Sequence, residues 1–316
     1  MIVRWGLDEL PAVLREVGVE RPLLVASERW TNLDVPRVAH WSEVPSHRIE
    51  VPPEADSLLA VGGGSAIDTA KFASSQTELP VVSVPTTYSG AEWAHTFGIR
   101  SPDRRMQGGG GGAQLAAIVY DVDLTLELPL AETVGTALNA LAHCAEALYV
   151  QGRNEEADRA ALEGARLIAR ALPRVVEQPD DRDAREELLR GACHAGEALG
   201  LAGLGLAHAI AQALGGRYGL PHGAMNALAL PPALRFNALA VPQEVVRFGQ
   251  AIGAGDPAAG VEQLAALGRF GRLRDFGVPR EELADVAEAA AQRGGNQMNP
   301  RQATPSQIEE LLAYIW

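Results

Sequence analysis

One stretch of the sequence, residues 58–71 (LLAVGGGSAIDTAK), constrains the fold more than any other. Its opening residues, 58–61, are apolar and form too short a run for a helix, which predicts a buried strand of a parallel sheet. Three consecutive glycines follow, and a run with helical spacing then starts at Ser65. A strand, a glycine turn and a helix in direct succession predict an α/β domain.

The glycine turn is suited to hold a phosphate group. Glycines carry no Cβ and accept positive φ, so the backbone can approach a ligand closely. Ser65 is a predicted N-cap, and the free N–H groups and the dipole of the following helix favour an anion. The pattern is neither GxGxxG nor a Walker loop. A plain strand-to-helix turn of any α/β protein explains the same stretch, so the turn alone leaves both interpretations open.

Strand and helix patterns alternate over residues 1–130. A helix is expected over residues 7–17, ending at Gly18. The proline-rich residues 32–55 offer only short strands, at 38–44 and 47–51. Five consecutive glycines, residues 108–112, predict a flexible loop. The other expected strands cover residues 23–26, 58–61, 80–84, 97–100 and 116–120.

After Pro129 the pattern changes to helices alone, with prolines 173, 179, 221 and 279 between them. The sequence therefore predicts a nucleotide-type α/β domain over residues 1–130 and an all-helical domain over residues 131–316. The clearest helices are expected at residues 133–150, 155–172, 182–199 and 207–214, and the pattern continues at 223–236, 242–252 and 261–270 and in the segments from 280 and 304.

Composition excludes several classes of function. The formal net charge of −13 argues against a nucleic-acid partner, which needs a basic surface. No signal peptide and no membrane span are expected from the hydropathy pattern. Cys144 and Cys193 form neither a metal-binding pattern nor a disulfide framework. A cytoplasmic location is expected.

A set of polar side chains in the helical half points to chemistry. Asn139 and His143 are four residues apart, so they project from one face of a helix. His208 and His222 lie on later helical segments and could converge with them on one pocket. A single helical histidine is more often structural, and His40, His47 and His194 are taken as structural.

At these residues the sequence resembles the iron-containing alcohol dehydrogenase family, and most closely its maleylacetate reductase branch. The resemblance implies a Rossmann-like N-terminal domain, an all-α C-terminal domain and an active site in the cleft between them. The blocks that carry it are VGGGSAIDTAK at 61–71, VPTTYSGAE at 84–92, IVYDVDLTLELP at 118–129, TALNALAHCAEAL at 136–148, LGGRYGLPHGAMNALALP at 214–231 and NPRQAT at 299–304.

The resemblance also implies a nicotinamide cofactor, NAD or NADP. Glu28 follows the second strand, where a carboxylate binds the adenosine ribose and favours NAD, whereas Arg29 could instead receive a 2′-phosphate. Both also fit an ordinary solvated loop. The residues implied in cofactor binding are Glu28, Gly62, Gly63, Gly64, Ser65, Asp68, Thr86, Thr87 and Ser89.

In metal-dependent members of this family an Asp and three His hold a divalent ion, and the matching positions here are Asn139, His143, His208 and His222. Asn139 removes the only anionic ligand, and an amide oxygen is a weaker donor. The resemblance therefore favours metal-free chemistry, in which the histidines bind the substrate and supply a proton. If a metal is bound instead, the three histidines would be its ligands.

The sequence departs from the family pattern at several places. Gln212 stands where a histidine is usual, and Arg104 or Arg105 replaces a lysine before the strand at 116–120. The glycine turn after the first strand is reduced to Trp5-Gly6, and the segment between Glu28 and Leu58 is short. These losses fall on the cofactor side.

Three hypotheses follow. The first is an NAD(P)H-dependent reductase of a carbonyl or enone in a small carboxylated molecule, acting as a homodimer, with Tyr88, Asn139, His143, His208, His222 and Arg105 at the substrate. The second is a lyase, cyclase or isomerase that reuses the same cleft. The third is an inactive scaffold, which the intact set of histidines argues against.

Overall fold

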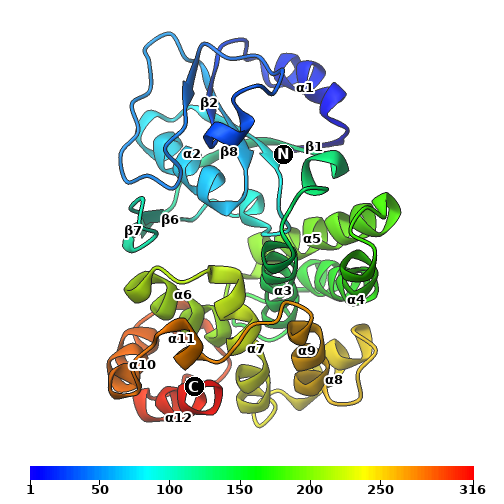
Figure 1. Ribbon diagram of the computed structural model, residues 1–316, viewed down its shortest axis with the longest axis vertical. Coiled ribbons are helices and arrows are strands. Elements are labelled where there is room, and N and C mark those ends of the chain that lie inside the picture. Colours follow the sequence, from blue (N-terminus) through cyan, green and yellow to red (C-terminus); the bar gives the residue numbers. More distant parts are fainter. The chain divides into compact units, whose positions relative to one another are not determined.

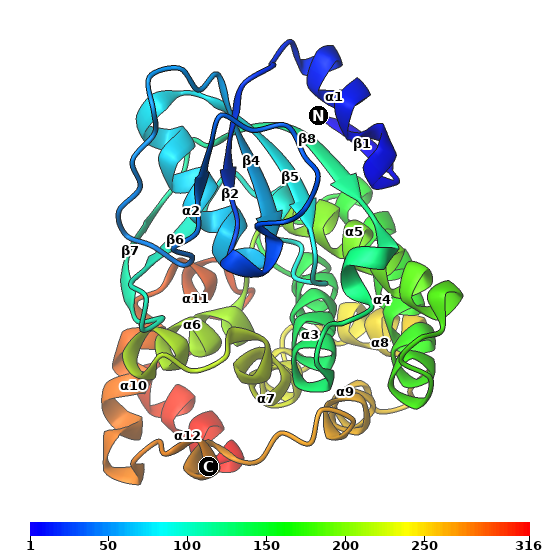
Figure 2. The same cartoon turned by 45° about the horizontal axis from the view of Figure 1, so that its top comes forward.

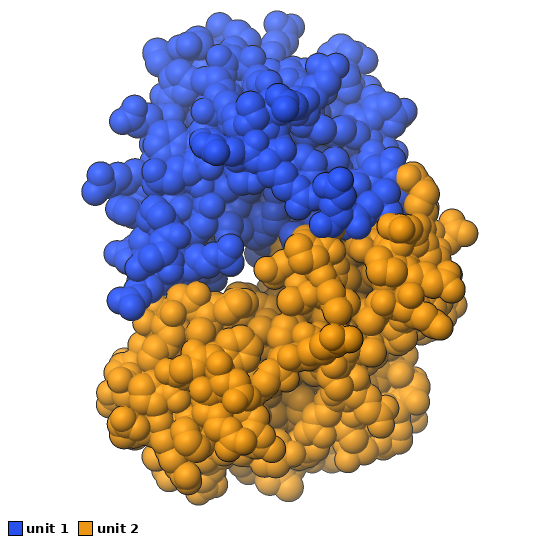
Figure 3. Space-filling view, viewed as in Figure 1, with its two compact units in different colours: residues 1–87, 91–127 blue, residues 88–90, 128–316 orange.

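The computed structural model describes residues 1–316. The chain forms two compact units, coloured separately in Figure 3. The first contains residues 1–87 and 91–127, and the second contains residues 88–90 and 128–316. The short segment 88–90 therefore belongs to the second unit, although its neighbours on both sides belong to the first.

The first unit is built on a six-stranded sheet in which every pair of neighbours is parallel. The strand order is β1-β8-β5-β4-β2-β3, and the sheet is seen in Figure 2. The strands are β1 (Ile2–Trp5), β2 (Pro22–Val25), β3 (Ala39–Trp41), β4 (Ser57–Gly62), β5 (Pro80–Pro85) and β8 (Gln114–Tyr120).

Helices cover both faces of this sheet. Helix α1 (Leu10–Val17) packs its buried side chains, such as Leu14, against Leu24 and Leu59. Helix α2 (Gly64–Thr77) packs Ile67 and its neighbours against strand residues that alternate with those two. Successive strand residues point to opposite faces, so the central strands are apolar throughout. The predicted α/β domain is confirmed.

The first three glycines of the run, residues 108–110, lie in a strand and not in the expected flexible loop. Strand β7 (Met106–Gly110) pairs antiparallel with β6 (Phe97–Arg100). A Cβ on Gly110 would lie 2.9 Å from the ring of Phe97, so glycine lets the two strands approach. Glycine composition predicts a flexible backbone, but it does not reveal that a partner strand is available.

The proline-rich segment also differs from expectation. Only Ala39–Trp41 pairs as a strand, alongside β2, and residues 47–51 form no strand. A run of β-formers becomes a strand only when a neighbouring edge is free to pair with it. Between β2 and β4 the only helical segment is the three-residue turn Glu28–Trp30, so this part of the chain has no full helix, as the sequence predicts.

The second unit contains helices alone, which confirms the all-helical half (Figure 1). Pro173 was expected to separate two helices, but it lies inside α4, which therefore extends to Glu177. The helices are α3 (Leu130–Ala147), α4 (Glu155–Glu177), α5 (Arg182–Ala202), α6 (Leu206–Tyr218), α7 (His222–Asn237), α8 (Pro242–Ala251), α9 (Pro257–Ala266), α10 (Leu283–Ala291), α11 (Gly294–Met298) and α12 (Pro305–Ile315).

Helix α3 is buried along almost its whole length and lies beside α4, α5 and α7. Small residues allow close packing around it: a Cβ on Gly164 of α4 would lie 2.9 Å from the sulfur of Cys144. None of the helices is, by itself, both long and apolar enough to span a membrane; α5 and α6 reach that measure only together, with a 100° bend.

Candidate active site

The glycine turn joins β4 to α2 with no intervening loop. Gly62 has φ of +150°, and a Cβ there would lie 2.9 Å from that of Ala66. Gly63 is the N-cap of α2, and no side chain caps the helix. Ser65 is therefore inside the helix and not its cap, because the helix begins directly at the end of the turn. The uncapped first turn leaves amide groups available to an anion.

Thr87 completes this turn. A Cβ on Gly63 would lie 2.8 Å from the Thr87 methyl group, so the glycine backbone packs directly on the threonine. The Thr87 hydroxyl is buried and has no hydrogen-bond partner in the protein. Thr86, the residue before it, is also buried. An unpaired buried hydroxyl beside an open helix N-terminus fits a phosphate-containing ligand, as the nicotinamide cofactors are.

Glu28 and Arg29 lie just beyond the carboxyl end of β2, the neighbour of β4 in the sheet. Both are exposed. The Arg29 guanidinium is 3.0 Å from the Glu127 carboxylate and lies over the Trp30 ring. Arg29 is thus engaged within the unit, and this leaves Glu28 as the better candidate for a ribose hydroxyl at this edge.

Asp68 has a structural role that the sequence did not predict. Its carboxylate is 2.9 Å from the Lys71 ammonium and accepts a hydrogen bond from the Gly98 amide of β6. Lys71 is 1% exposed and also donates to the carbonyls of residues 91, 94 and 96. This pair fixes the hairpin to α2, and the predicted contact of Asp68 with a cofactor stays a prediction.

In the helical unit, α3, α6 and α7 bring the three predicted histidines together. The rings of His143 and His208 are stacked with centroids 4.6 Å apart, and the ring of His222 lies 5.9 Å from that of His208. His143 and His208 are almost fully buried. Residues separated by up to 79 positions in the sequence (143 to 222) thus form one cluster, as the sequence predicts.

Burial sets the charge of the His143 ring. It lowers the pKa of His143 well below its usual value, and the neighbouring His208 and His222 lower it further because a second positive charge would be repelled. His143 is therefore neutral at physiological pH. Its Nδ1 is buried without a hydrogen-bond partner in the protein, which leaves it able to bind a ligand.

Asn139 lies one turn before His143 and is held on both sides of its amide. Its Nδ2 donates to the Ser89 carbonyl at 2.9 Å, and its Oδ1 accepts from Asn226 at 2.7 Å. Asn226 also contacts the Nε2 of His222 at 3.1 Å. The hydroxyl of Ser89 is buried and without a partner. The amide therefore orders the cluster and Ser89 together.

The residues at this cluster do not fit the iron that is implied by the family resemblance. The Asn139 oxygen already accepts a hydrogen bond, and the set contains no carboxylate directed at a shared point. No group of three or more His, Cys, Asp or Glu side chains in the structure is arranged to hold a metal ion. Imidazoles alone suit borderline cations, but here an amide oxygen that already accepts a hydrogen bond stands in place of an anionic ligand, which weakens the set as an iron site.

Two further predicted residues make contacts of their own. Tyr88 is fully buried in the helical unit, where its hydroxyl is 3.2 Å from the guanidinium of buried Arg185. Arg105 lies in the turn between β6 and β7, and its guanidinium is 3.7 Å from Asp103. Their predicted contacts with a substrate stay predictions.

Sequence reasoning missed three residues. Glu146 is fully buried and contacts His208, and Asn226 joins Asn139 to His222. Arg293 reaches Gln212, one turn after His208, with 3.4 Å between Nη1 and Oε1. The spacing of Glu146, three residues after His143, could have suggested it; the other two depend on contacts between distant helices.

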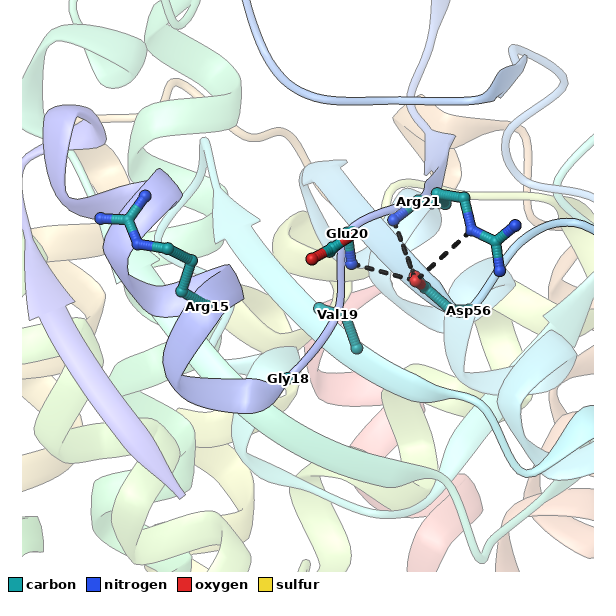
Figure 4. Close-up of a pocket in the computed structure, with 6 residues that line it drawn as sticks. All are labelled: Arg15, Gly18, Val19, Glu20, Arg21 and Asp56. Atoms are coloured by element: carbon teal, nitrogen blue, oxygen red, sulfur yellow. Dashed lines mark hydrogen bonds and ion pairs between the residues drawn. The ribbon is translucent and has the colours of Figure 1, made fainter.

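A separate depression of about 500 Å³ lies in the first unit, and none of the predicted site residues lines it (Figure 4). It is lined by residues 15, 18–21 and 56, and the Asp56 carboxylate accepts hydrogen bonds from the amides of Glu20 and Arg21. These residues precede β2 and β4, at the amino ends of the strands, whereas ligands of parallel sheets bind at the carboxyl ends.

Comparisons with known proteins identify the family. The family described as "Fe-containing alcohol dehydrogenase family, C-terminal" matches residues 133–316, and "Iron-containing alcohol dehydrogenase" matches residues 34–98. A maleylacetate reductase from Sphingobium indicum is 37% identical over 82% of this chain and 74% of its own length. Another, from Pseudomonas knackmussii, is 34% identical over 97% of this chain and 92% of its own.

Solved structures agree. The maleylacetate reductase of Rhizobium sp. strain MTP-10005 superposes with a TM-score of 0.85 at 29% identity, covering 100% of this chain and 95% of that one. An iron-containing alcohol dehydrogenase from Corynebacterium glutamicum gives 0.87 at 29% identity, with 100% and 94% covered. The fold, the family matches and these relatives together confirm the resemblance: this chain belongs to the iron-containing alcohol dehydrogenase family and is an oxidoreductase similar to maleylacetate reductases.

Proposed function

We propose that this protein is an NAD(P)H-dependent reductase that reduces a carbonyl or enone in a small carboxylated substrate and works without a metal. The observation that carries the proposal is the cluster of three histidines ordered by Asn139, which lacks an anionic metal ligand but holds imidazoles at one point. The relatives named maleylacetate reductases support the substrate class.

The cofactor would bind the turn at residues 62–64, with Thr87 beside it and Glu28 on the adenosine ribose, which favours NAD. When bound, a dihydronicotinamide supplies a hydride. Support comes from the uncapped N-terminus of α2 and the buried unpaired hydroxyl of Thr87. Ser65, Asp68, Thr86 and Ser89 stay predicted members of the cofactor site.

The histidines would handle the substrate. Neutral His143 is suited to hold the substrate oxygen by a hydrogen bond, and His208 or His222 would give a proton to the oxygen that becomes negative. Arg293 is the arginine that reaches this part of α6, through Gln212, so we assign it to the substrate carboxylate in preference to Arg105. Tyr88 stays a predicted substrate contact.

A fluorescence titration with NADH tests the cofactor site. Gly63→Ala introduces a Cβ that collides with Thr87, and we expect its Kd for NADH to rise more than tenfold. The matched control is Gly255→Ala, because a Cβ there meets nothing within 4 Å. Absence of NADH and NADPH binding to the parent protein at millimolar concentration would overturn the proposal.

Turnover tests the reaction. We expect maleylacetate to be consumed with an equal loss of NADH absorbance, and the rate to survive treatment with a chelator. Product formation without a change in absorbance would instead support a non-redox reaction. The same preparations, examined by light scattering, test the expected homodimer.

A further inference from the structure

Glu146 is a carboxylate buried in the helical unit, with 0% of its surface exposed, and it accepts four hydrogen bonds. Three come from backbone amides at the start of α6: Gly205 at 2.7 Å, Ala207 at 2.8 Å and His208 at 3.3 Å. The fourth joins its Oε2 to Nδ1 of the His208 ring at 2.6 Å. A charge this deeply buried needs such a set of donors.

This geometry assigns the protons of His208. An ionised carboxylate only accepts hydrogen bonds, so Nδ1 of His208 must carry the hydrogen. The other ring nitrogen, Nε2, is buried and has no hydrogen-bond partner in the protein. The centroid of the His208 ring lies 4.6 Å from that of His143 and 5.9 Å from that of His222. Nε2 therefore belongs to the histidine cluster that we assign to the substrate.

The backbone around Glu146 is shaped to fit it. Helix α6 has no cap from its own sequence, because Gly205 is the N-cap residue, and the carboxylate from α3 takes that place. A Cβ on Gly205 would lie 3.0 Å from the Glu146 carboxyl carbon, so only glycine leaves the carboxylate its position. One side chain thus anchors both the first turn of α6 and the imidazole that this turn carries.

We propose that Glu146 is the positioning residue of His208, which fixes the ring and its tautomer so that Nε2 is presented to the substrate. When bound, a dihydronicotinamide would supply the hydride to the substrate carbon; Nε2 of His208 would then give a proton to the resulting oxyanion, while Nδ1–H would stay bonded to Glu146. The ring then regains a proton from water. This step rests on the proposed function; the orientation of the ring does not.

The test is Glu146→Gln, which keeps the size of the side chain but adds an amide donor facing His208. We expect nitrogen NMR of the protein without ligands to show that His208 loses its Nδ1–H tautomer. We also expect kcat to fall about 10–100-fold, as it does when the partner of a functional histidine is lost, with KM for NADH little changed. Glu146→Asp should recover part of the kcat, because it restores the acceptor.

The matched control is Glu92→Gln, which removes another buried carboxylate, bonded to Tyr120 in the first unit. It should change neither the His208 signals nor kcat. If Glu146→Gln does not fold, Gly205→Ala gives the same readouts by displacing the carboxylate without removing it. Wild-type His208 signals together with wild-type kcat in the folded Glu146→Gln variant would overturn the proposal.

The two proposals fail in different ways. If the parent protein reduces no substrate with either cofactor, the proposed function is wrong. The NMR measurement would still report whether Glu146 sets the tautomer of His208, since it needs neither cofactor nor substrate.

Discussion

His143 illustrates how burial controls the proton of a single side chain. Its pKa lies well below the usual 6.5 because the ring is buried, and the neighbouring imidazoles add to the effect. In the unfolded chain the same ring regains the usual value. Below pH 6.5 the unfolded state therefore binds a proton that the folded state does not, and the free energy of unfolding must fall as pH falls through this window.

We predict that His143→Gln removes this proton linkage. The parent protein should lose up to about 1.4 kcal/mol of stability per pH unit from this group below its usual pKa, down to the depressed folded value, and nothing above it. Urea unfolding from pH 5 to 8 measures the difference between the two proteins. As a control, His194→Gln changes a side chain that is 39% exposed. The difference in the free energy of unfolding between this variant and the parent should vary much less with pH. Parallel curves for His143→Gln would contradict the prediction.

Asn139 supports a second prediction at this scale. Its Nδ2–H bonds to the Ser89 carbonyl, and the carboxylate of Asn139→Asp would face that carbonyl with no proton to donate. We expect the free energy of unfolding to fall by about 1–3 kcal/mol at pH 7.5. Since the change adds an anionic group to three imidazoles, zinc should stabilise the variant more than the parent protein.

Thermal unfolding with and without zinc provides the measurement. The control is Asn237→Asp, a buried asparagine of the same unit whose Nδ2 bonds to Asn299 and which lies outside the cluster. It should lose comparable stability and gain nothing from zinc. If zinc stabilises the parent protein as much as Asn139→Asp, the proposal of a metal-free site is wrong.

In the hairpin of β6 and β7, some glycines are required for the two strands to pair and others could be replaced. A Cβ on Gly110 would meet the Phe97 ring at 2.9 Å, whereas a Cβ on Gly108 would meet only the end of Ile99 at 3.8 Å. We predict that Gly110→Ala opens the hairpin and that Gly108→Ala leaves it within about 0.5 kcal/mol of the parent. Hydrogen exchange of residues 97–110 measures both, and equal protection in the two variants would contradict the argument.

The elements also mark the limits of sequence reasoning. Hydrophobic periodicity identified the central strands and most helices, because the order of apolar and polar residues along these segments determines which side chains are buried. It missed β7 because pairing depends on a partner strand, and it placed a break at Pro173 although α4 continues past it. Likewise, Ser65 looked like a cap, but the helix starts at the end of the glycine turn. Each error concerns tertiary context that competes with a local preference.

At the scale of the whole molecule, the division into an α/β half and a helical half followed from the change of pattern near residue 130, and the structure divides in the same region. The convergence of three histidines was predictable from the resemblance. Glu146 and Asn226 were not, because their roles depend on how α3, α6 and α7 pack together.

Cofactor binding should stabilise the folded chain by mass action. At a concentration one hundred times Kd, NADH should raise the free energy of unfolding by about 2.7 kcal/mol. We predict a smaller effect for NADPH at equal concentration, because the exposed Glu28 carboxylate would repel a 2′-phosphate. Urea unfolding with each cofactor gives the comparison, and Glu28→Gln should narrow the gap. Greater stabilisation by NADPH in the parent would contradict the assignment of Glu28.

Lys71 is the only lysine in the sequence, and its ammonium is enclosed by Asp68 and three carbonyls. An acylating reagent that targets lysine amines therefore finds no side chain to modify while this part of the protein stays folded. The rate of acylation at Lys71, measured by mass spectrometry, would give the frequency with which helix α2 separates from the hairpin of β6 and β7. Acylation of this single lysine therefore reports local opening of the first unit.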